Sequence, residues 1–322
     1  MKRQVLITGG FGYLGGRAAQ LLAKRDDLQL TLGTRELRQA PGWLPEAKTA
    51  QLDWASDASL AAQCSGVETI LHLAAMNEND CASDPVEALI SNGVSTARLL
   101  RAAIAAGVPR FIYLSTAHIY GSALTGKITE AKVPRPQHPY ATSHRAGEDC
   151  VLAAHDRRTI TGCVLRLSNA FGAPVHPAVN RWTLLVNDLC RQAIQQKRLV
   201  LYSAGQQIRD FITLHDAARA LSHSIDMSKN DVGDGIFNVG GECSMRIIDV
   251  AREVSVRCAA VLGFSPELHH PTANGAELEQ PYEYNIDKFK KTGFMLAGSR
   301  QEEIDSTLRL CQAAFGVGSV SP

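Results

Sequence analysis

VLITGGFGYLGG, residues 5–16, is the segment from which the fold of this chain can first be inferred. Its apolar start is typical of a β-strand, and residues 17–24 after it have a helical pattern. Gly9, Gly12 and Gly15 lie between the two at the spacing GxxGxxG. In this setting glycines permit a tight turn and let backbone N–H groups approach a pyrophosphate, which faces the helix N-terminus. The segment predicts a dinucleotide-binding turn, and the alternative is a turn with a structural role alone.

Short apolar runs alternate with helical patterns along the N-terminal half of the chain. Further strands are expected at residues 28–32, 49–52, 69–73, 111–115 and 161–167, and helices at 86–106 and 140–154. Gly107 and Pro109 end the longer of these helices. Strands that alternate with helices form βαβ units, in which helices cover both faces of a parallel sheet. The pattern predicts an α/β fold with a Rossmann-type, doubly wound parallel sheet.

The pattern changes after Gly172, where strands and helices no longer alternate regularly. The elements expected beyond it are a helix near residues 181–195, strands at 199–202 and 210–213, a further helix, and a strand at 235–239. We expect residues 1–172 to form a dinucleotide-binding domain, to which a segment of about residues 206–241 returns. Residues 173–322 are expected to form mainly a smaller C-terminal substrate-binding lobe.

The composition is that of an ordinary globular protein and restricts its partners. The 322 residues include 33 basic and 32 acidic ones, a balance that gives no electrostatic reason to expect nucleic acid or an anionic membrane. No apolar run approaches the roughly 18 residues that a membrane helix needs. The eight cysteines are dispersed without a CxxC pair, which argues against zinc and disulfides and favours a reducing cytoplasm. The histidines lack the spacing of metal ligands, so no metal site is expected.

The end of the second strand should meet the adenosine ribose of a dinucleotide. An acidic side chain there accepts hydrogen bonds from both ribose hydroxyls and favours NAD, whereas a basic one pairs with a 2′-phosphate and favours NADP. The sequence reads LTLGTRE (residues 30–36), with no acid at the strand end itself. Thr34 and Arg35 can hold a phosphate, so NAD(P) is the expected cofactor, with NADP favoured. The alternative for Arg35 is a solvated arginine at a strand end.

Eight motifs follow one another along most of the chain. They are TGGFGYLG (8–15), LHLAA (71–75), STAHIYG (115–121), PYATSH (139–144), RLSNAFG (166–172), RDFITLHDAARA (209–220), FNVGG (237–241) and NIDKFK (285–290). Any one of them can arise by chance, but the ordered set resembles the extended short-chain dehydrogenase/reductase family, in its nucleotide-sugar epimerase/dehydratase branch. The resemblance implies an NAD(P)-dependent enzyme that acts on a nucleotide-activated sugar.

The resemblance also implies a set of cofactor-binding residues. Besides the strand end, they are Gly9, Gly12, Tyr13, Leu14, Gly15, Asp53, Leu73, Ala74, Ala75, Asn92 and His144. By this resemblance Asp53 hydrogen-bonds the adenine amino group. Ala74 and Ala75 line the cofactor beside the nicotinamide, and Asn92 supports the active-site strand.

Further positions are implied to act on the substrate. Thr116 and Tyr140 occupy the positions of the family's catalytic Ser/Thr and tyrosine. Asn169 lies where the family presents an asparagine near substrate and cofactor. Arg209 resembles the arginine that clamps the diphosphate of a nucleotide sugar, a task suited to a bidentate fork. The alternative for Arg209 is a surface arginine at the start of a strand.

The sequence departs from the family at residue 144, where the expected lysine is a histidine. In the family this lysine, one turn after the tyrosine, supplies a positive charge and holds the nicotinamide ribose. His144 points where that ammonium would be, since positions i and i+4 share a helix face. Neutral imidazole can bond the ribose but brings no charge at pH 7. A lysine charge this close lowers the pKa of the tyrosine by about 1–3 units. Without that charge, the ionised fraction of the tyrosine is about tenfold to a thousandfold smaller.

Two features can compensate for the missing lysine. The oxidised nicotinamide is itself a cation, and Glu148, one turn further along the helix, can favour a protonated His144. Arg145 cannot substitute, because i+5 is rotated roughly 140° from the direction of Tyr140. Three interpretations of His144 stay open: a packed neutral histidine, a ribose-binding catalytic substitute, and a change that abolishes activity.

The residues after Thr116 bear on the type of reaction. Related dehydratases carry an Asp–Glu pair there, whereas this chain has Ala117 and His118. Because neither carboxylate is present, a sugar 4,6-dehydratase is disfavoured. His118 either contacts the substrate or shapes its loop.

We therefore expect Tyr140-assisted hydride transfer at a sugar carbon, by an epimerase or by a dehydrogenase or ketoreductase. The alternative from another class is a cofactor-binding redox sensor or scaffold with little or no catalysis. The family commonly forms homodimers through two helices of the dinucleotide domain. Residues 86–106 and 140–154 are the candidates for these helices.

Overall fold

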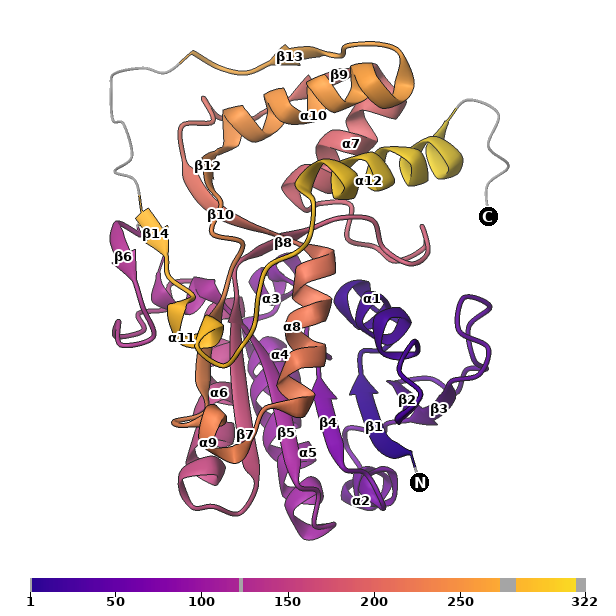
Figure 1. The fold of residues 1–322 in the computed structure, drawn as a ribbon, viewed down its shortest axis with the longest axis vertical. Coiled ribbons are helices and arrows are strands. Elements are labelled where there is room, and N and C mark those ends of the chain that lie inside the picture. Colours follow the sequence, from indigo (N-terminus) through magenta and orange to yellow (C-terminus); the bar gives the residue numbers. More distant parts are fainter. Residues whose placement is uncertain (1, 122–123, 273–281, 317–322) are drawn as a thin grey trace.

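The computed structural model describes residues 2–121, 124–272 and 282–316, and its centre is a seven-stranded parallel sheet (Figure 1). The strands are β1 (Arg3–Thr8), β2 (Leu28–Thr34), β3 (Lys48–Gln51), β4 (Thr69–His72), β5 (Arg110–Thr116), β7 (Thr161–Leu167) and β11 (Ile236–Val239). Their order is β11-β7-β5-β4-β1-β2-β3, and every neighbouring pair is parallel. From β1 the chain adds β2 and β3 on one side and then β4, β5, β7 and β11 on the other, and open α/β sheets form a ligand crevice at such a switch in strand order. The predicted Rossmann-type, doubly wound sheet is confirmed.

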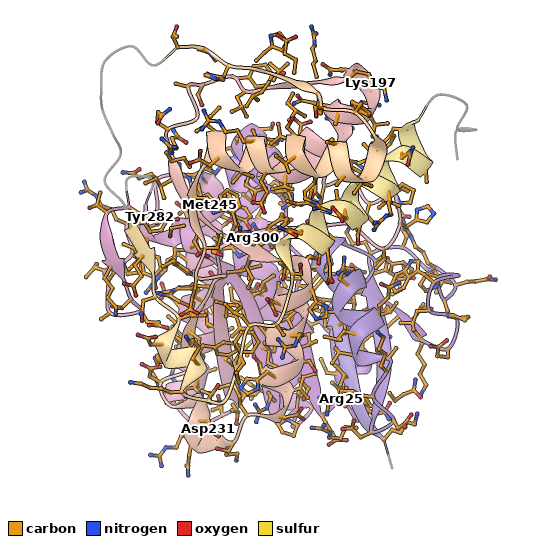
Figure 2. The ribbon with its side chains drawn as sticks, turned by 45° about the horizontal axis from the view of Figure 1, so that its top comes forward. Arg25, Lys197, Asp231, Met245, Tyr282 and Arg300 are labelled. Atoms are coloured by element: carbon orange, nitrogen blue, oxygen red, sulfur yellow. The ribbon has the colours of Figure 1, made fainter. Side chains whose placement is uncertain are left out.

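Helices cover both faces of the sheet. They are α1 (Tyr13–Leu22) and α8 (Leu214–Asp226) on one face, and α2 (Asp57–Cys64), α5 (Ser95–Ala105) and α6 (Pro139–Asp156) on the other. Val5 and Ile7 of β1 pack on the first face and Leu6 on the second, because successive side chains of a strand point to opposite faces. At the end of the molecule that carries the N-terminus lies Arg25 (Figure 2), which follows α1 and pairs with Asp226 of α8 at 2.6 Å.

A second lobe lies above the carboxyl ends of the parallel strands (Figure 1). It contains α7 (Leu185–Gln196), α10 (Ile247–Leu262), α12 (Arg300–Phe315), the three-stranded sheet of β8 (Asn169–Phe171), β10 (Ile208–Thr213) and β12 (Ser244–Arg246), and the pair β9 (Arg198–Val200) and β13 (Glu267–His269). Phe171, Trp182 and Phe211 belong to its own apolar core. The smaller elements are α3 (Glu78–Ser83), β6 (Gly126–Ile128), α9 (Lys229–Val232), β14 (Tyr282–Tyr284) and α11 (Asp287–Lys290). Through α8 and β11 the chain returns from this lobe to the first sheet.

The helix expected over residues 86–106 is present, but it is not α-helical throughout. α4 (Pro85–Ala88) is followed by a π-helical turn at Leu89–Val94, and only then by α5. The turn carries Asn92, whose side-chain oxygen accepts a hydrogen bond from the Met76 N–H at 2.8 Å. A π-turn within a helix is frequent at functional sites, and this one is bonded to the loop that follows β4.

Three features of the described ranges bear on partners. No helix in them is both long enough and apolar enough to cross a bilayer. All eight cysteines lie within these ranges, and each is free. Nor do the described residues include a group of three or more His, Cys, Asp or Glu side chains placed to hold a metal ion.

Candidate active site

A cavity of about 950 Å³ opens at the carboxyl ends of the parallel strands, next to the second lobe. One wall is built from the residues that follow β1, β2, β4 and β5, and the other from β8, β10 and the segment before α7. Ligands of open α/β sheets bind in this crevice, because the carboxyl ends of the strands meet there. All of the predicted site residues line the cavity except Asp53 and Asn92.

The glycine turn forms one end of the cavity and depends on the absence of side chains. Gly9 has a φ of +68°, in the left-handed region that favours glycine. A Cβ at Gly15 would lie 2.1 Å from the Gly9 carbonyl oxygen, so the first turn of α1 packs directly on the loop. Gly12 is the N-cap of α1, and no side chain caps the helix there. With Tyr13 and Leu14 also in the lining, the start of α1 has the arrangement that binds phosphate groups.

The end of β2, the strand next to β1 in the sheet, forms part of the cavity wall. Thr34 and Arg35 both line it, and Arg35 is exposed. Asp53, predicted to meet adenine, is not part of the lining. One of its carboxylate oxygens accepts a hydrogen bond from the Ala55 N–H at 3.0 Å, and the residue is exposed beside Leu52 and Trp54 of the lining.

Asn92 is buried behind the cavity wall. Its amide nitrogen donates to Ser143 Oγ at 2.9 Å, while its oxygen accepts from Met76. The side chain therefore joins α6 to the loop after β4, in which Ala74 and Ala75 line the cavity. Asn92 therefore supports the cavity wall, and it has no surface in the cavity with which to contact a cofactor directly.

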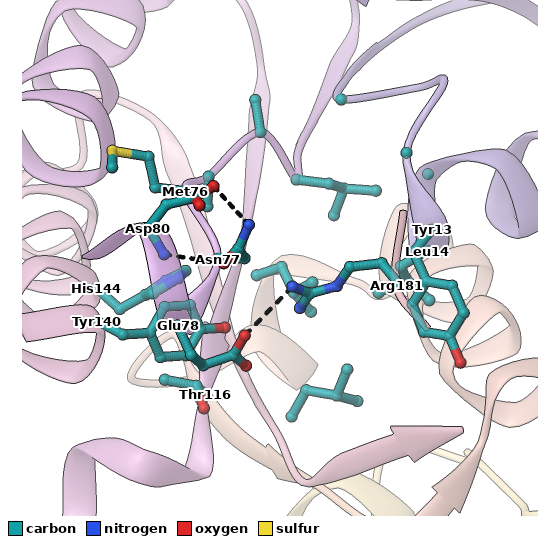
Figure 3. A pocket seen from close by; sticks show the side chains of 18 of the residues that line it. Tyr13, Leu14, Met76, Asn77, Glu78, Asp80, Thr116, Tyr140, His144 and Arg181 are labelled. Atoms are coloured by element: carbon teal, nitrogen blue, oxygen red, sulfur yellow. Dashed lines mark hydrogen bonds and ion pairs between the residues drawn. The ribbon is translucent and has the colours of Figure 1, made fainter. Parts of the chain in front are cut away.

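Thr116, Tyr140 and His144 meet on one wall of the cavity (Figure 3). Thr116 ends β5 and caps the 3-10 turn Ala117–Tyr120, its Oγ1 accepting from the His118 N–H at 3.2 Å. Tyr140 lies in the first turn of α6, and its ring centroid is 4.5 Å from that of His144, edge to face. The His118 ring lies 6.3 Å from the Tyr140 ring. The fold therefore brings the three predicted catalytic residues together.

The surroundings of Tyr140 and His144 favour the neutral form of both side chains. Burial, followed by the negative charge of Glu78, raises the pKa of Tyr140 above its ordinary value. Burial lowers the pKa of His144 to about 4, and Glu78 opposes this shift only in part. Because a neutral imidazole supplies no positive charge, position 144 does not stabilise the phenolate form of Tyr140.

One ring nitrogen of His144 is bonded and the other is not. Nδ1 lies 3.1 Å from the hydroxyl of Tyr113, a buried residue of β5. Nε2 is buried and has no hydrogen-bond partner among the described residues. Buried polar atoms are nearly always hydrogen-bonded, so this nitrogen fits a polar group of a bound molecule. Glu148, expected to favour protonation of His144, instead binds the Arg166 guanidinium at 2.8 and 2.9 Å, and that expectation is wrong.

The predicted substrate-binding residues His118, Asn169 and Arg209 also line the cavity. The Asn169 side chain donates to the carbonyl of Asp210 at 2.9 Å. Arg209 Nη1 donates to the carbonyl of Ile208, also at 2.9 Å. The backbone of β10 therefore orients both side chains at the edge of the cavity.

Two charged residues that the sequence analysis did not single out face each other in the cavity (Figure 3). Arg181 Nη1 lies 3.2 Å from Glu78 Oε2. Glu78 begins α3, whereas Arg181 comes 103 positions later, in the segment before α7. The position of Glu78 three residues after the LHLAA motif (71–75) is a signal that could have marked it. No local pattern marks Arg181.

Comparisons relate the chain to known proteins. The model of the NAD dependent epimerase/dehydratase family matches residues 5–240. The low-salt glycan biosynthesis protein Agl12 of Haloferax volcanii is 26% identical over 304 residues, which cover 90% of this chain and 92% of that protein. The dTDP-D-glucose 4,6-dehydratase of Mus musculus is 24% identical over 266 residues, covering 78% and 72%. The structure of UDP-glucuronic acid 4-epimerase from Bacillus cereus in complex with UDP-glucuronic acid and NAD has a TM-score of 0.80 at 21% identity, covering 96% of this chain and 99% of that one.

The structural likeness extends over nearly the whole of both chains and supports the same fold. The match to the family model begins in β1 and ends just after β11, so it includes every strand of the parallel sheet. It also includes the glycine turn and the wall that carries Thr116, Tyr140 and His144. The resemblance seen in the ordered motifs is confirmed, and the chain belongs to the NAD-dependent epimerase/dehydratase family, among the extended short-chain dehydrogenases/reductases.

Proposed function

We propose that the protein is an NAD(P)-dependent oxidoreductase or epimerase that acts on a nucleotide-activated sugar. The observation that carries this proposal is that Thr116, Tyr140 and His144 share one cavity with the glycine turn. A phenol that can transfer a proton and a helix start that can bind an anion suit the two ends of a dinucleotide. The mouse dehydratase and the Bacillus cereus epimerase are both named for nucleotide sugars, which supports the substrate class.

Two features of the chain fit a nicotinamide dinucleotide. The close approach of Gly15 to Gly9 leaves the amides at the start of α1 for a pyrophosphate. The unbonded Nε2 of His144 offers one hydrogen bond to a ribose hydroxyl. Ala74 and Ala75 would line the nicotinamide between these ends. When bound, the nicotinamide supplies the carbon that accepts or returns a hydride.

In the proposed reaction, side chains of the cavity position the sugar and move one proton. Arg209 would clamp the diphosphate, and Asn169 and His118 would meet the sugar. Tyr140 Oη would exchange a proton with the sugar oxygen on the reacting carbon, next to the Thr116 hydroxyl. If the resulting ketone rotates and is reduced on its other face, the product is an epimer. If the ketone leaves or arrives, the enzyme is a dehydrogenase or ketoreductase.

Dehydration of the sugar is less consistent with the residues after β5. Ala117 and His118 form the turn that Thr116 caps, and neither is a carboxylate. By the family resemblance, the glutamate of the Asp–Glu pair that dehydratases carry at this turn helps to expel water, and this chain lacks that pair. Epimerisation or simple oxidation and reduction therefore suits this turn better than 4,6-dehydration.

The proposal is tested by the absorbance of the bound cofactor when the purified protein meets a panel of nucleotide sugars. A sugar-dependent appearance of reduced nicotinamide, or formation of an epimer, is expected. Tight dinucleotide binding without turnover across the panel would contradict the proposal. It would favour a redox sensor or scaffold, a function suggested by the neutral His144 at the position of a charged group.

The preference between NAD and NADP is proposed to depend on Thr34 and Arg35. Arg35 is exposed at the end of β2, where a guanidinium can pair with a 2′-phosphate, and this favours NADP. The compared Bacillus cereus structure contains NAD. Titration of the protein with both dinucleotides measures the preference. Tighter binding of NADP would support pairing of Arg35 with the 2′-phosphate, and tighter binding of NAD would contradict it.

We also propose that two chains pair through the helical stretch that contains the π-turn. Val86, Leu89, Ile90 and Val94 keep between 43% and 68% of their surface exposed along it. Adjacent exposed apolar side chains of this size mark association surfaces. Val94→Asp should therefore convert a dimer to monomers in analytical ultracentrifugation, whereas Val256→Asp, at an exposed valine of α10, should leave the mass unchanged. A monomeric wild-type protein at the same concentration would contradict the pairing.

A further inference from the structure

Glu78 brings a carboxylate into the part of the cavity that holds the catalytic phenol. Figure 3 shows its carboxylate directed at Arg181, with Tyr140 and Thr116 close to the same wall. The side chains of Glu78 and Arg181 are 37% and 23% exposed. An ion pair this open contributes at most about 1 kcal/mol to stability. Stability therefore gives little reason for a charged pair inside a substrate cavity.

Glu78 is also the charge that most strongly influences the titratable groups around it. Its charge affects the pKa values of Tyr140 and His144 from α6, of His118 from the turn after β5 and of Cys81 from α3 itself, and its ion-pair partner is Arg181 from the segment before α7. Burial has the largest effect on the pKa of Tyr140, and Glu78 raises that pKa further. Burial lowers the pKa values of His144 and His118, and Glu78 opposes both shifts. No other charged group has a larger effect on these three side chains.

Residue 144 gives the phenol no outlet for a proton. His144 Nδ1 is bonded to the Tyr113 hydroxyl at 3.1 Å, and burial raises the pKa of Tyr113 well above its ordinary value. Burial also lowers the pKa of His144 to about 4, so the imidazole does not take up an extra proton near pH 7. A proton that leaves Tyr140 therefore needs another acceptor, and Glu78 places a carboxylate in the same cavity, on the side of Tyr140 (Figure 3).

We propose that Glu78 accepts the proton that Tyr140 releases, in place of a route through residue 144. This inference rests on the proposed function. In the oxidising direction the sugar hydroxyl gives its proton to Tyr140 Oη, while the phenol's own proton passes to a carboxylate oxygen of Glu78. The hydrogen on the sugar carbon leaves with its electron pair for an oxidised nicotinamide dinucleotide, so the alcohol becomes a ketone and the nicotinamide is reduced. In the reducing direction Glu78 returns the proton along the same path.

Glu78→Gln keeps the shape of the side chain and removes the acceptor. We expect kcat to fall by about 100- to 10,000-fold, with little change in dinucleotide affinity. The residual rate should rise with pH, because only ionised Tyr140 can then take the sugar proton. Glu78→Asp keeps a carboxylate and should recover part of the loss. Glu267→Gln makes the same change at a carboxylate that is 79% exposed and lies outside the cavity lining, 3.2 Å from His269 Nε2, and should leave kcat close to that of the wild type.

A second variant separates proton acceptance from a structural role. His144→Lys places a cation next to Tyr140, which lowers the pKa of the phenol and supplies the route that this chain lacks. We expect it to raise kcat at pH 7, and we expect Glu78→Gln to cost less than about tenfold in that background. An equal loss in both backgrounds would show that Glu78 acts structurally and would overturn the proposal.

The free protein gives a readout that does not depend on turnover. Because Glu78 raises the pKa of His118, Glu78→Gln should lower that pKa in an NMR titration of the ring, and Glu267→Gln should not. An unchanged His118 pKa would overturn the placement of Glu78. The kinetic outcomes distinguish the two proposals. A wild type without turnover contradicts the proposed function, whereas an active wild type whose kcat survives Glu78→Gln contradicts this inference alone.

Discussion

Tyr140→Phe should lower kcat by about 100- to 10,000-fold and leave the dissociation constant of the dinucleotide within about twofold of the wild-type value. The phenol oxygen is the proposed proton carrier, and phenylalanine lacks it. The variant keeps the ring that packs edge to face on His144, with centroids 4.5 Å apart, so the cavity wall should keep its shape. Steady-state kinetics with an active nucleotide sugar and calorimetric titration with the dinucleotide measure the two effects.

Tyr202 provides the matched control for this substitution. Its side chain is 90% exposed and lies outside the cavity lining, so Tyr202→Phe should change neither constant. Retained turnover in Tyr140→Phe would refute the assigned role. If dinucleotide binding and turnover are both lost, the phenol holds the dinucleotide and its effect on proton transfer is indirect.

Gly15→Val should weaken dinucleotide binding by more than about a hundredfold, which corresponds to about 3 kcal/mol. A Cβ at this position would lie 2.1 Å from the Gly9 carbonyl oxygen and 2.9 Å from its carbon, and both atoms belong to the backbone. The added side chain must therefore push the loop away from α1, which displaces the amides proposed to bind the pyrophosphate. Fluorescence or calorimetric titration with the dinucleotide measures the loss.

Gly42→Val controls for the loss of a glycine in general. No heavy atom lies within 4 Å of a Cβ built on Gly42, and the residue is exposed. Its dinucleotide affinity should equal that of the wild type. If Gly15→Val binds as tightly as Gly42→Val and remains folded by circular dichroism, the glycine turn is not the pyrophosphate site.

The parallel sheet could be predicted because its signals are local. Most of its strands are short apolar runs next to helical patterns, and the expected strand at residues 161–167 coincides with β7. The π-helical turn within the helix expected over 86–106 could not be predicted in the same way. The π-turn at Leu89–Val94 contains no proline, and its Asn92 is tied to Met76 and Ser143 by hydrogen bonds that form only in the folded chain.

The helix expected near residues 181–195 illustrates a similar limit. It begins at Leu185, because the residues before it belong to a non-helical segment packed into the second lobe. Trp182 lies in that segment, buried in the apolar core, and its indole N–H donates to the carbonyl of Pro177 at 2.9 Å. The sequence alone does not show whether an apolar aromatic residue next to a helical pattern lies inside the helix or before its first residue.

Most of the cavity lining could be predicted because the motifs follow strands whose carboxyl ends meet at one edge. The pairing of charged side chains could not. Glu148 shares a helix face with His144, yet it binds Arg166 of β7. Glu78 pairs with Arg181, which is 103 positions away in the second lobe. Such pairs depend on which elements the tertiary fold sets opposite each other, and spacing along one helix carries no information about them.

Rapid mixing of the dinucleotide-loaded protein with an active nucleotide sugar would show whether Tyr140 carries the proton that accompanies hydride transfer. In the wild type, the absorbance of reduced nicotinamide should appear within a single turnover. In Tyr140→Phe, loaded with oxidised dinucleotide to the same extent, it should not appear. Equal signals from the two proteins would contradict the role of Tyr140, as would a fully loaded wild type whose nicotinamide no sugar in the panel reduces.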